Sequence, residues 1–269
     1  EWIESGELSI TDRYVSDGKG QQSKNPSAKP GTTDTVGWVK KDNIWNYRFP
    51  DGSICRGAWQ SLNGYWYYFD VNGTMLTGWQ KVANDWYYLY DTGEMAAGWA
   101  KINGQWYYFW PLTENGHTQG TMAYGGWKII GADYYFFRED GSLYTGWLEQ
   151  NGSWYYLNTL DNSLQGAMLT GWLIREGKTY FLDADGVMAT GWRWIGGKWY
   201  YMNSAGAMQS GWFQDGQTWY YANGSGVMQT GWLNRGGTWY YLTGSGAMAT
   251  GWINLGGTWY YLNPGNGDM

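Results

Sequence analysis

The stretch from Gly191 to Met248 reads GWRWIGGKWYYMNSAGAMQS (191–210), GWFQDGQTWYYANGSGVMQT (211–230) and GWLNRGGTWYYLTGSGAM (231–248). It is one unit of 20 residues written three times. Each copy has a Gly-Trp start, a Gly-containing centre, a Trp-Tyr-Tyr run, a polar turn and a Met. A fixed period of this length indicates an array of small units, each of which buries its apolar face only against its neighbours.

Most tryptophans of the chain fall into this pattern. An opening Trp stands at 38, 59, 79, 99, 127, 147, 172, 192, 212, 232 and 252. A second Trp follows seven residues later in nine units, at 45, 66, 86, 106, 154, 199, 219, 239 and 259. The two series hold 20 of the 23 tryptophans, and only Trp2, Trp110 and Trp194 lie outside them. We therefore predict about eleven repeats over residues 37–269.

Two insertions interrupt the period, within 110–119 and within 159–165. Tyr134 and Thr179 replace the second Trp in the fifth and seventh repeats. The repeat domain is thus expected to comprise regular repeats over 37–126, an irregular middle over 127–191 and regular repeats over 191–269. Residues 1–36 are poor in apolar side chains from 18 onward and are interpreted as the tail of an upstream module followed by a flexible linker.

Within a repeat the residues favour strands. Trp, Tyr and Thr suit a pleated, half-buried surface, and Gly and Asn between the two Trp positions suit a tight turn. A two-residue turn at Asp215-Gly216 would place Trp212 directly opposite Trp219, with Tyr221 on the same face and Tyr220 on the other. Units with Asn63-Gly64 or Asn103-Gly104 are open to a longer, bulged turn. A single hairpin is marginal in water, so the expected fold is an all-β solenoid of stacked β-hairpins.

The composition excludes several classes of function. A net charge of −6 argues against nucleic acid as a partner, and the lack of an 18-residue apolar run argues against a transmembrane segment. One cysteine, Cys55, and one histidine, His117, supply neither a disulfide nor a metal site, and nothing in the sequence brings them together as a nucleophilic pair. The carboxylates are scattered. We predict no enzyme activity, cofactor or metal for this chain, and any catalysis is expected in a domain outside it.

The aromatic residues suggest the chemistry of the site instead. Several ring faces around a small hollow attract a cation that lacks strong hydrogen-bond donors, such as trimethylammonium, at about 0.5–2 kcal/mol for each ring. The alternative is that these rings only form the core, a role expected for the first Tyr of each pair. Leu, Ile and Val, the usual core residues, are sparse here.

The pattern GWxxxxGxWYYLxxxGxMxTGW resembles the choline-binding repeats of Gram-positive cell-surface proteins and phage lysins. The resemblance covers residues 37–269 and recurs about eleven times. It implies a left-handed superhelix of hairpins in a secreted, cell wall-associated protein, with choline or phosphocholine of teichoic acids bound between consecutive hairpins. It also implies that each site is a cage formed by the opening Trp and second Trp of one repeat and the second Tyr of the next.

Six complete cages follow from that resemblance. They are Trp38, Trp45, Tyr68; Trp59, Trp66, Tyr88; Trp79, Trp86, Tyr108; Trp192, Trp199, Tyr221; Trp212, Trp219, Tyr241; and Trp232, Trp239, Tyr261. Three weaker, altered cages are Trp99, Trp106 with Phe136; Trp127 with Tyr134 and Tyr156; and Trp147, Trp154 with Phe181. The junction at Trp172 has Thr179 as its second wall and is expected to be empty.

A second interpretation is a glucan-binding or toxin-type carbohydrate repeat. Those families share the Gly-Trp and Tyr-Tyr-Phe pattern, and the segment GKTYFLDADG in the seventh repeat resembles them more closely. The second Trp, present in nine of eleven units, favours choline.

Overall fold

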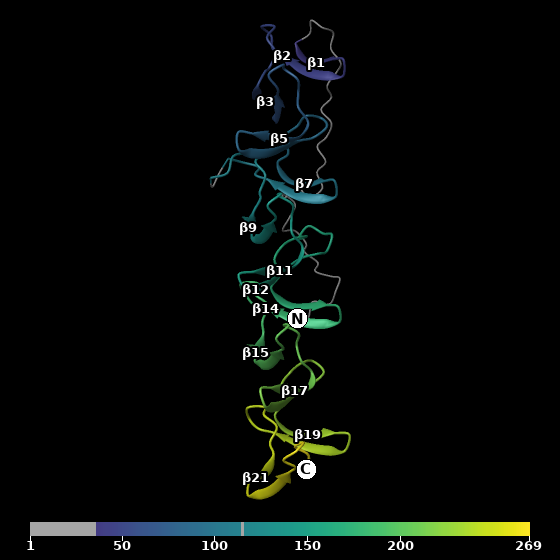
Figure 1. Cartoon of the computed structure of the whole chain (residues 1–269), viewed down its shortest axis with the longest axis vertical. Coiled ribbons are helices and arrows are strands. Elements are labelled where there is room, and N and C mark those ends of the chain that lie inside the picture. Colours follow the sequence, from purple (N-terminus) through teal and green to yellow (C-terminus); the bar gives the residue numbers. More distant parts are fainter. Residues whose placement is uncertain (1–35, 114–115) are drawn as a thin grey trace. The chain divides into compact units, whose positions relative to one another are not determined.

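The computed structural model of the chain describes residues 36–113 and 116–269. Every regular element in these ranges is a β-strand of five residues, and the 22 strands pair as eleven two-stranded antiparallel hairpins (Figure 1). The prediction of an all-β array of eleven hairpins is therefore confirmed. The predicted upstream tail and linker lie outside the described residues, apart from Val36.

The described residues divide into two compact units. The N-terminal unit contains residues 36–146 and 157–167, and the C-terminal unit contains residues 147–156 and 168–269. The hairpins of the N-terminal unit are β1 (Gly37–Lys41) with β2 (Ile44–Arg48), β3 (Ala58–Leu62) with β4 (Tyr65–Phe69), β5 (Gly78–Val82) with β6 (Asp85–Leu89), β7 (Gly98–Ile102) with β8 (Gln105–Phe109), and β9 (Gly126–Ile130) with β10 (Asp133–Phe137).

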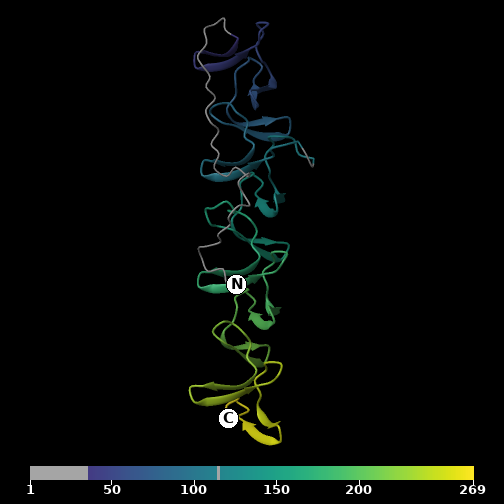
Figure 2. The ribbon, with the colours of Figure 1, turned by 180° about the vertical axis from the view of Figure 1, so that it is seen from behind.

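The other six hairpins belong to the C-terminal unit, apart from the end residues Gly146 and Leu157. They are β11 (Gly146–Gln150) with β12 (Ser153–Leu157), β13 (Gly171–Arg175) with β14 (Lys178–Leu182), β15 (Gly191–Ile195) with β16 (Lys198–Met202), β17 (Gly211–Asp215) with β18 (Thr218–Ala222), β19 (Gly231–Arg235) with β20 (Thr238–Leu242), and β21 (Gly251–Leu255) with β22 (Thr258–Leu262). Both views of the ribbon show that consecutive hairpins within this unit follow one another in chain order (Figures 1 and 2).

The turn of the hairpin β17–β18 lies one residue later than the predicted turn at Asp215-Gly216. Asp215 is the last residue of β17 and pairs with Thr218, so the two-residue turn is Gly216-Gln217. Trp212 therefore stands opposite Tyr221, not opposite Trp219, and the predicted direct pairing of the two indoles is wrong. The prediction that Trp219 and Tyr221 share a face, with Tyr220 on the other, is confirmed by the same register.

Asn63-Gly64 and Asn103-Gly104 also form two-residue turns, so the longer, bulged turn considered for these units is not used. Leu62 pairs with Tyr65, and Ile102 pairs with Gln105. Asn63 and Gly64 both have positive φ values, 53° and 85°. This is the backbone of a type I′ turn, which matches the twist of the two strands that it joins.

Within each unit, backbone hydrogen bonds connect successive hairpins. The amide of the Met that follows a hairpin donates to the carbonyl of the second Trp in the preceding repeat. In the C-terminal unit this bond joins Met228 to Trp199 at 2.9 Å and Met248 to Trp219 at 2.8 Å. In the N-terminal unit it joins Met75 to Trp45 at 2.7 Å. Through this repeated link a hairpin is held by its predecessor within the unit, as in solenoids.

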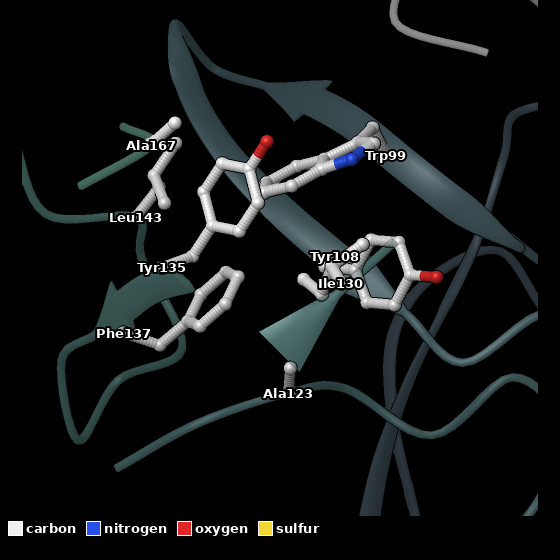
Figure 3. Packing of buried hydrophobic residues seen from close by; sticks show 8 residues of the cluster. All are labelled: Trp99, Tyr108, Ala123, Ile130, Tyr135, Phe137, Leu143 and Ala167. Carbon is white, nitrogen blue, oxygen red and sulfur yellow. The ribbon is translucent and has the colours of Figure 1, made fainter. Parts of the chain in front are cut away.

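The core lies between consecutive hairpins and alternates along each strand. The residue after the second Tyr is completely buried in most repeats, as for Leu89, Met202 and Leu242. Tyr67, the first Tyr of its pair, is also buried, which confirms the core role predicted for that position. Figure 3 shows one such core in the N-terminal unit, where Trp99 and Tyr135 lie side by side above Phe137.

The first insertion, the single histidine and the single cysteine of the described residues have plain structural roles. Phe109 forms its isolated bridge with Met122, whereas Phe69 does so with Met75, and the first insertion lengthens the intervening loop. Within that loop His117 stacks on Trp110 with ring centroids 3.9 Å apart. Cys55 is a free thiol buried beside Leu62 and Phe69, where burial raises its pKa. It behaves as the small apolar residue that the sequence indicated.

Candidate functional site

Each hairpin carries its aromatic residues on one face. In the hairpin β17–β18, Trp212 and Tyr221 are opposite one another with ring centroids 5.2 Å apart. Trp219 pairs with Gln214, two residues nearer to the turn, so it lies diagonally from Trp212 on the same face. The two strands thus present two indoles and a phenol together, because their side chains alternate with a period of two.

The two indoles of a repeat stand at right angles. In six repeats the opening and second Trp have centroids 6.3–6.5 Å apart and ring planes inclined by 79–89°. The second Trp of most repeats is 38–44% exposed, as in Trp66, Trp199 and Trp239. The pair therefore forms an open corner with one indole face accessible from solvent.

A further ring closes this corner from the next hairpin. Trp192 contacts Tyr220 with centroids 4.8 Å apart, and Trp232 contacts Tyr260 at 4.9 Å. The same contact recurs in both units, for example between Trp38 and Tyr67 at 4.7 Å. In every case the partner is the first Tyr of the following repeat. The resemblance assigns the second Tyr of that repeat to the cage, and that assignment stays a prediction.

The second Tyr groups with the indoles of its own hairpin instead. Its ring lies 4.8–5.2 Å from the opening Trp directly opposite, in the pairs Trp59–Tyr68, Trp79–Tyr88, Trp99–Tyr108, Trp212–Tyr221, Trp232–Tyr241 and Trp252–Tyr261. A junction that follows a repeat with both indoles and a second Tyr therefore contains four rings, three from one hairpin and one from the next. The predicted tyrosines all line the aromatic face of their own hairpin, and their assignment to the cages of the preceding repeats stays a prediction.

The altered repeats follow the same geometry. Phe136 lies 5.4 Å from Trp127 of its own hairpin, and Phe181 lies 5.0 Å from Trp172 of its own. The other rings predicted for these cages remain in place: Trp99 and Trp106 at 6.4 Å, Trp147 and Trp154 at 6.5 Å, and Trp147 and Tyr156 at 5.0 Å. Tyr134 is exposed on β10. Thr179 pairs with Ile174, so the junction at Trp172 lacks a second aromatic wall.

One position brings charged groups to the rings. This position lies in the repeat that follows the rings. It is the last residue of the first strand of that repeat, three residues after the opening Trp of the same repeat. In the ninth repeat this residue is Asp215. It accepts hydrogen bonds from two ring residues of the eighth repeat, from Trp192 Nε1 at 2.9 Å and from the Tyr201 hydroxyl at 3.1 Å. Burial, together with the Asp215 carboxylate, raises the pKa of Tyr201. Sequence reasoning missed this contact, because Asp215 was taken for a turn residue.

At two other junctions the same position is cationic. Arg235 lies over the Tyr221 ring at 5.3 Å, and Arg175 lies over the Tyr156 ring at 5.1 Å. Arg175 Nε also donates to the Tyr156 hydroxyl at 2.7 Å. At these two junctions a guanidinium of the protein itself therefore lies over a ring face, the position that a bound cation would take.

The described residues contain neither a metal cluster nor a membrane-spanning helix. Within 36–113 and 116–269 no group of three or more His, Cys, Asp or Glu residues could hold a metal ion. No helix in those ranges is long and apolar enough to cross a bilayer.

The family comparison bears on the aromatic junctions directly. The model described as "Choline-binding repeat" matches residues 55–97, 76–118, 124–165, 189–230 and 229–269, more than half of the chain. The chain belongs to the choline-binding repeat family. A second model, described as "Putative cell wall binding repeat", matches residues 170–188, which include the Thr179 repeat. No curated protein matches the chain.

Several solved structures are similar to this member of the choline-binding repeat family. CbpJ from Streptococcus pneumoniae TIGR4 is 38% identical, with 79% of this chain and 87% of that chain covered and a TM-score of 0.62. Choline binding protein F from Streptococcus pneumoniae is 33% identical, with 87% and 92% covered and a TM-score of 0.62. The modular autolysin LytC from Streptococcus pneumoniae is 26% identical, with 87% and 52% covered and a TM-score of 0.53.

One choline-binding repeat differs from its neighbours by an extra indole. Trp194 pairs with Trp199 across β15 and β16, with ring centroids 5.3 Å apart, and is 59% exposed. Lysines take the same position in three repeats of the N-terminal unit, and the ammonium of Lys40 lies 5.4 Å from the Trp45 ring. Trp194 lies outside both tryptophan series, and this was the only sign in the sequence that the repeat carries a third indole.

Proposed function

We propose that this chain is a non-covalent cell-wall attachment module that binds choline at the aromatic junctions between consecutive hairpins. The observation that carries this proposal is the open corner of two perpendicular indoles, closed by a tyrosine from the next hairpin. Each ring contributes about 0.5–2 kcal/mol toward a cation, so one junction binds choline weakly, in the millimolar range. Family membership supports the choice of choline over other organic cations.

The partner that we propose is choline or phosphocholine displayed on teichoic acids, which places the protein at the cell surface. Many weak junctions at a uniform pitch would then act together. After the first contact, further contacts are intramolecular, and avidity exceeds the affinity of one site by roughly 10² to 10⁴. Choline binding protein F has been solved with a peptidoglycan analogue, which supports a wall location for that relative.

The role that we propose for the described residues is binding. The relative LytC is described as a modular autolysin, and this chain covers 52% of it. A repeat array of this kind therefore occurs in that protein together with other parts. For the present chain, any enzymatic role is assigned to a domain outside it.

Thermal unfolding with added ligands tests the proposal. Choline that binds only the folded protein raises the melting temperature by mass action, by about 2.7 kcal/mol for each site when its concentration is 100 times the dissociation constant. Dextran and galactose at equal concentration serve as controls for the carbohydrate-binding alternative. Stabilisation by dextran but not by choline would refute the proposal.

A further inference from the structure

The junctions are not electrically equivalent. We propose that the residue three places after the opening Trp of the following repeat, where it is charged, sets which form of the ligand the junction takes. Asp215 makes the junction at Trp192 favour choline without an attached phosphate, whereas Arg175 and Arg235 make their junctions favour phosphocholine. This inference rests on the proposed function, because it concerns the same aromatic junctions.

The carboxylate lies at the edge of the ring corner. Both Asp215 oxygens are within 3.1 Å of donors on ring residues, Trp192 Nε1 and the Tyr201 hydroxyl. A cation over these rings, within about 6 Å of a ring centroid, is therefore close to a negative charge, and its binding is strengthened. A phosphate attached to that cation brings two or nearly two negative charges toward the same carboxylate, and its binding is weakened.

The arginines reverse that preference. Arg235 lies 5.3 Å from the centre of the Tyr221 ring, in the junction of Trp212 and Trp219. Its guanidinium opposes a bare cation at the same rings. A guanidinium also binds phosphate oxygens well, often through two parallel hydrogen bonds, so the phosphate end of phosphocholine gains a partner there. Arg175 stands in the same relation to Tyr156, with a hydrogen bond that fixes its position.

The junction at Trp192 has a second feature that suits a bare cation. Trp194 adds an indole 5.3 Å from Trp199 on the same face. A guanidinium does occur nearby, since Arg193 donates to the Trp192 carbonyl at 2.9 Å. Arg193 pairs with Tyr200, however, and so belongs to the opposite face of the hairpin. The charge that faces the rings is that of Asp215.

Fluorine NMR of the full chain labelled with 5-fluorotryptophan resolves single junctions. Replacement of Trp199 or Trp219 by Phe assigns the resonance that reports each junction, and choline and phosphocholine are titrated separately. We expect the ratio of the phosphocholine to the choline dissociation constant to be at least about tenfold larger at Trp199 than at Trp219, from unit charges about 6 Å apart in a medium between protein and water.

Three variants separate charge from packing. Asp215→Asn retains an acceptor for Trp192 and should lower the ratio at Trp199 by about three- to tenfold. Arg235→Gln should raise the ratio at Trp219 by a similar factor. Asp185→Asn, on an exposed turn, is the matched control and should change neither. Raising the salt from 0.05 to 0.5 M should reduce the difference between the junctions, because ions screen charges over a few ångströms at that strength.

The outcomes distinguish this inference from the function on which it rests. Equal ratios at Trp199 and Trp219, unchanged by Asp215→Asn, would overturn the inference while both ligands still shift the resonances. If neither choline nor phosphocholine shifts any tryptophan resonance, the proposed function fails, and the inference fails with it.

Discussion

Replacing Gly206 by Ala should destabilise the C-terminal unit strongly. Gly206 has φ of +78°, a left-handed conformation that costs a residue with a Cβ about 1–2 kcal/mol. A Cβ at this position would lie 2.3 Å from Met188 Sδ, 2.6 Å from Cε and 2.9 Å from Cγ. Because Cγ is included, rotation of the terminal methyl group alone does not relieve the contact.

The magnitude follows from these two effects. Overpacking of a filled site costs about 1–3 kcal/mol. The lower entropy of the unfolded chain with Ala offsets about 0.4–1 kcal/mol. The expected loss for Gly206→Ala is therefore about 1–4 kcal/mol of unfolding free energy.

A matched control separates the clash from the backbone strain. Gly211 has φ of +73°, but a Cβ there meets no atom within 4 Å. Gly211→Ala should therefore lose only the backbone contribution. The double variant Gly206→Ala with Met188→Ala removes the clashing side chain, and its loss should be smaller than the sum of the two single losses. Urea unfolding followed by circular dichroism measures the wild type, Gly206→Ala, Gly211→Ala, Met188→Ala and the double variant. Equal losses for Gly206→Ala and Gly211→Ala would refute the steric reasoning.

Three further predictions concern the rings. Trp232→Ala should remove one binding equivalent in a calorimetric choline titration, and an unchanged stoichiometry would mean that the opening indole is not part of a site. Thr179→Trp should add one equivalent by supplying the missing wall beside Trp172, unless the rings only form core. Burial raises the pKa of Tyr67 and Tyr87, so the folded state keeps these protons when the unfolded state loses them near pH 10. This stabilising contribution is complete below about pH 10 and is lost as the pH rises further, so the urea midpoint should fall above pH 10 and not below.

The sequence was sufficient to predict the repeats, their number and their strands, because each depends on a local pattern. The turn position was predicted one residue too early. Asp215-Gly216 is a strong turn signal by itself. The equivalent residues of the next repeat, Arg235 and Gly236, are not, and in both repeats the turn begins at the Gly. Aligning the repeats is thus a better guide to the register than the best dipeptide in one of them.

The tyrosine that closes each junction could not be predicted in the same way. A period of two determines which side chains of a hairpin share a face. It does not determine which neighbouring hairpin meets that face, since this depends on the rotation from one hairpin to the next. For the same reason the contact of Asp215 with Trp192, 23 residues earlier in the chain, has no signal in either repeat alone. The side chains that differ between repeats set the charge beside the rings, whereas the repeat pattern contains only the residues that the repeats share.

The rings serve as core and as ligand surface at once, and the last hairpin shows how the two roles depend on each other. Trp252 is 67% exposed, whereas Trp232, which β21 and β22 follow, is 37% exposed. The difference lies in the next hairpin, whose Tyr260 lies 4.9 Å from Trp232. A following hairpin therefore covers part of the opening indole and also supplies the ring that closes the corner. A cation that binds at this corner contacts both hairpins, so it stabilises the interface between them and not only the hairpin that carries the two indoles. Choline binding and the stability of the array are consequently linked at every junction where both hairpins are in place.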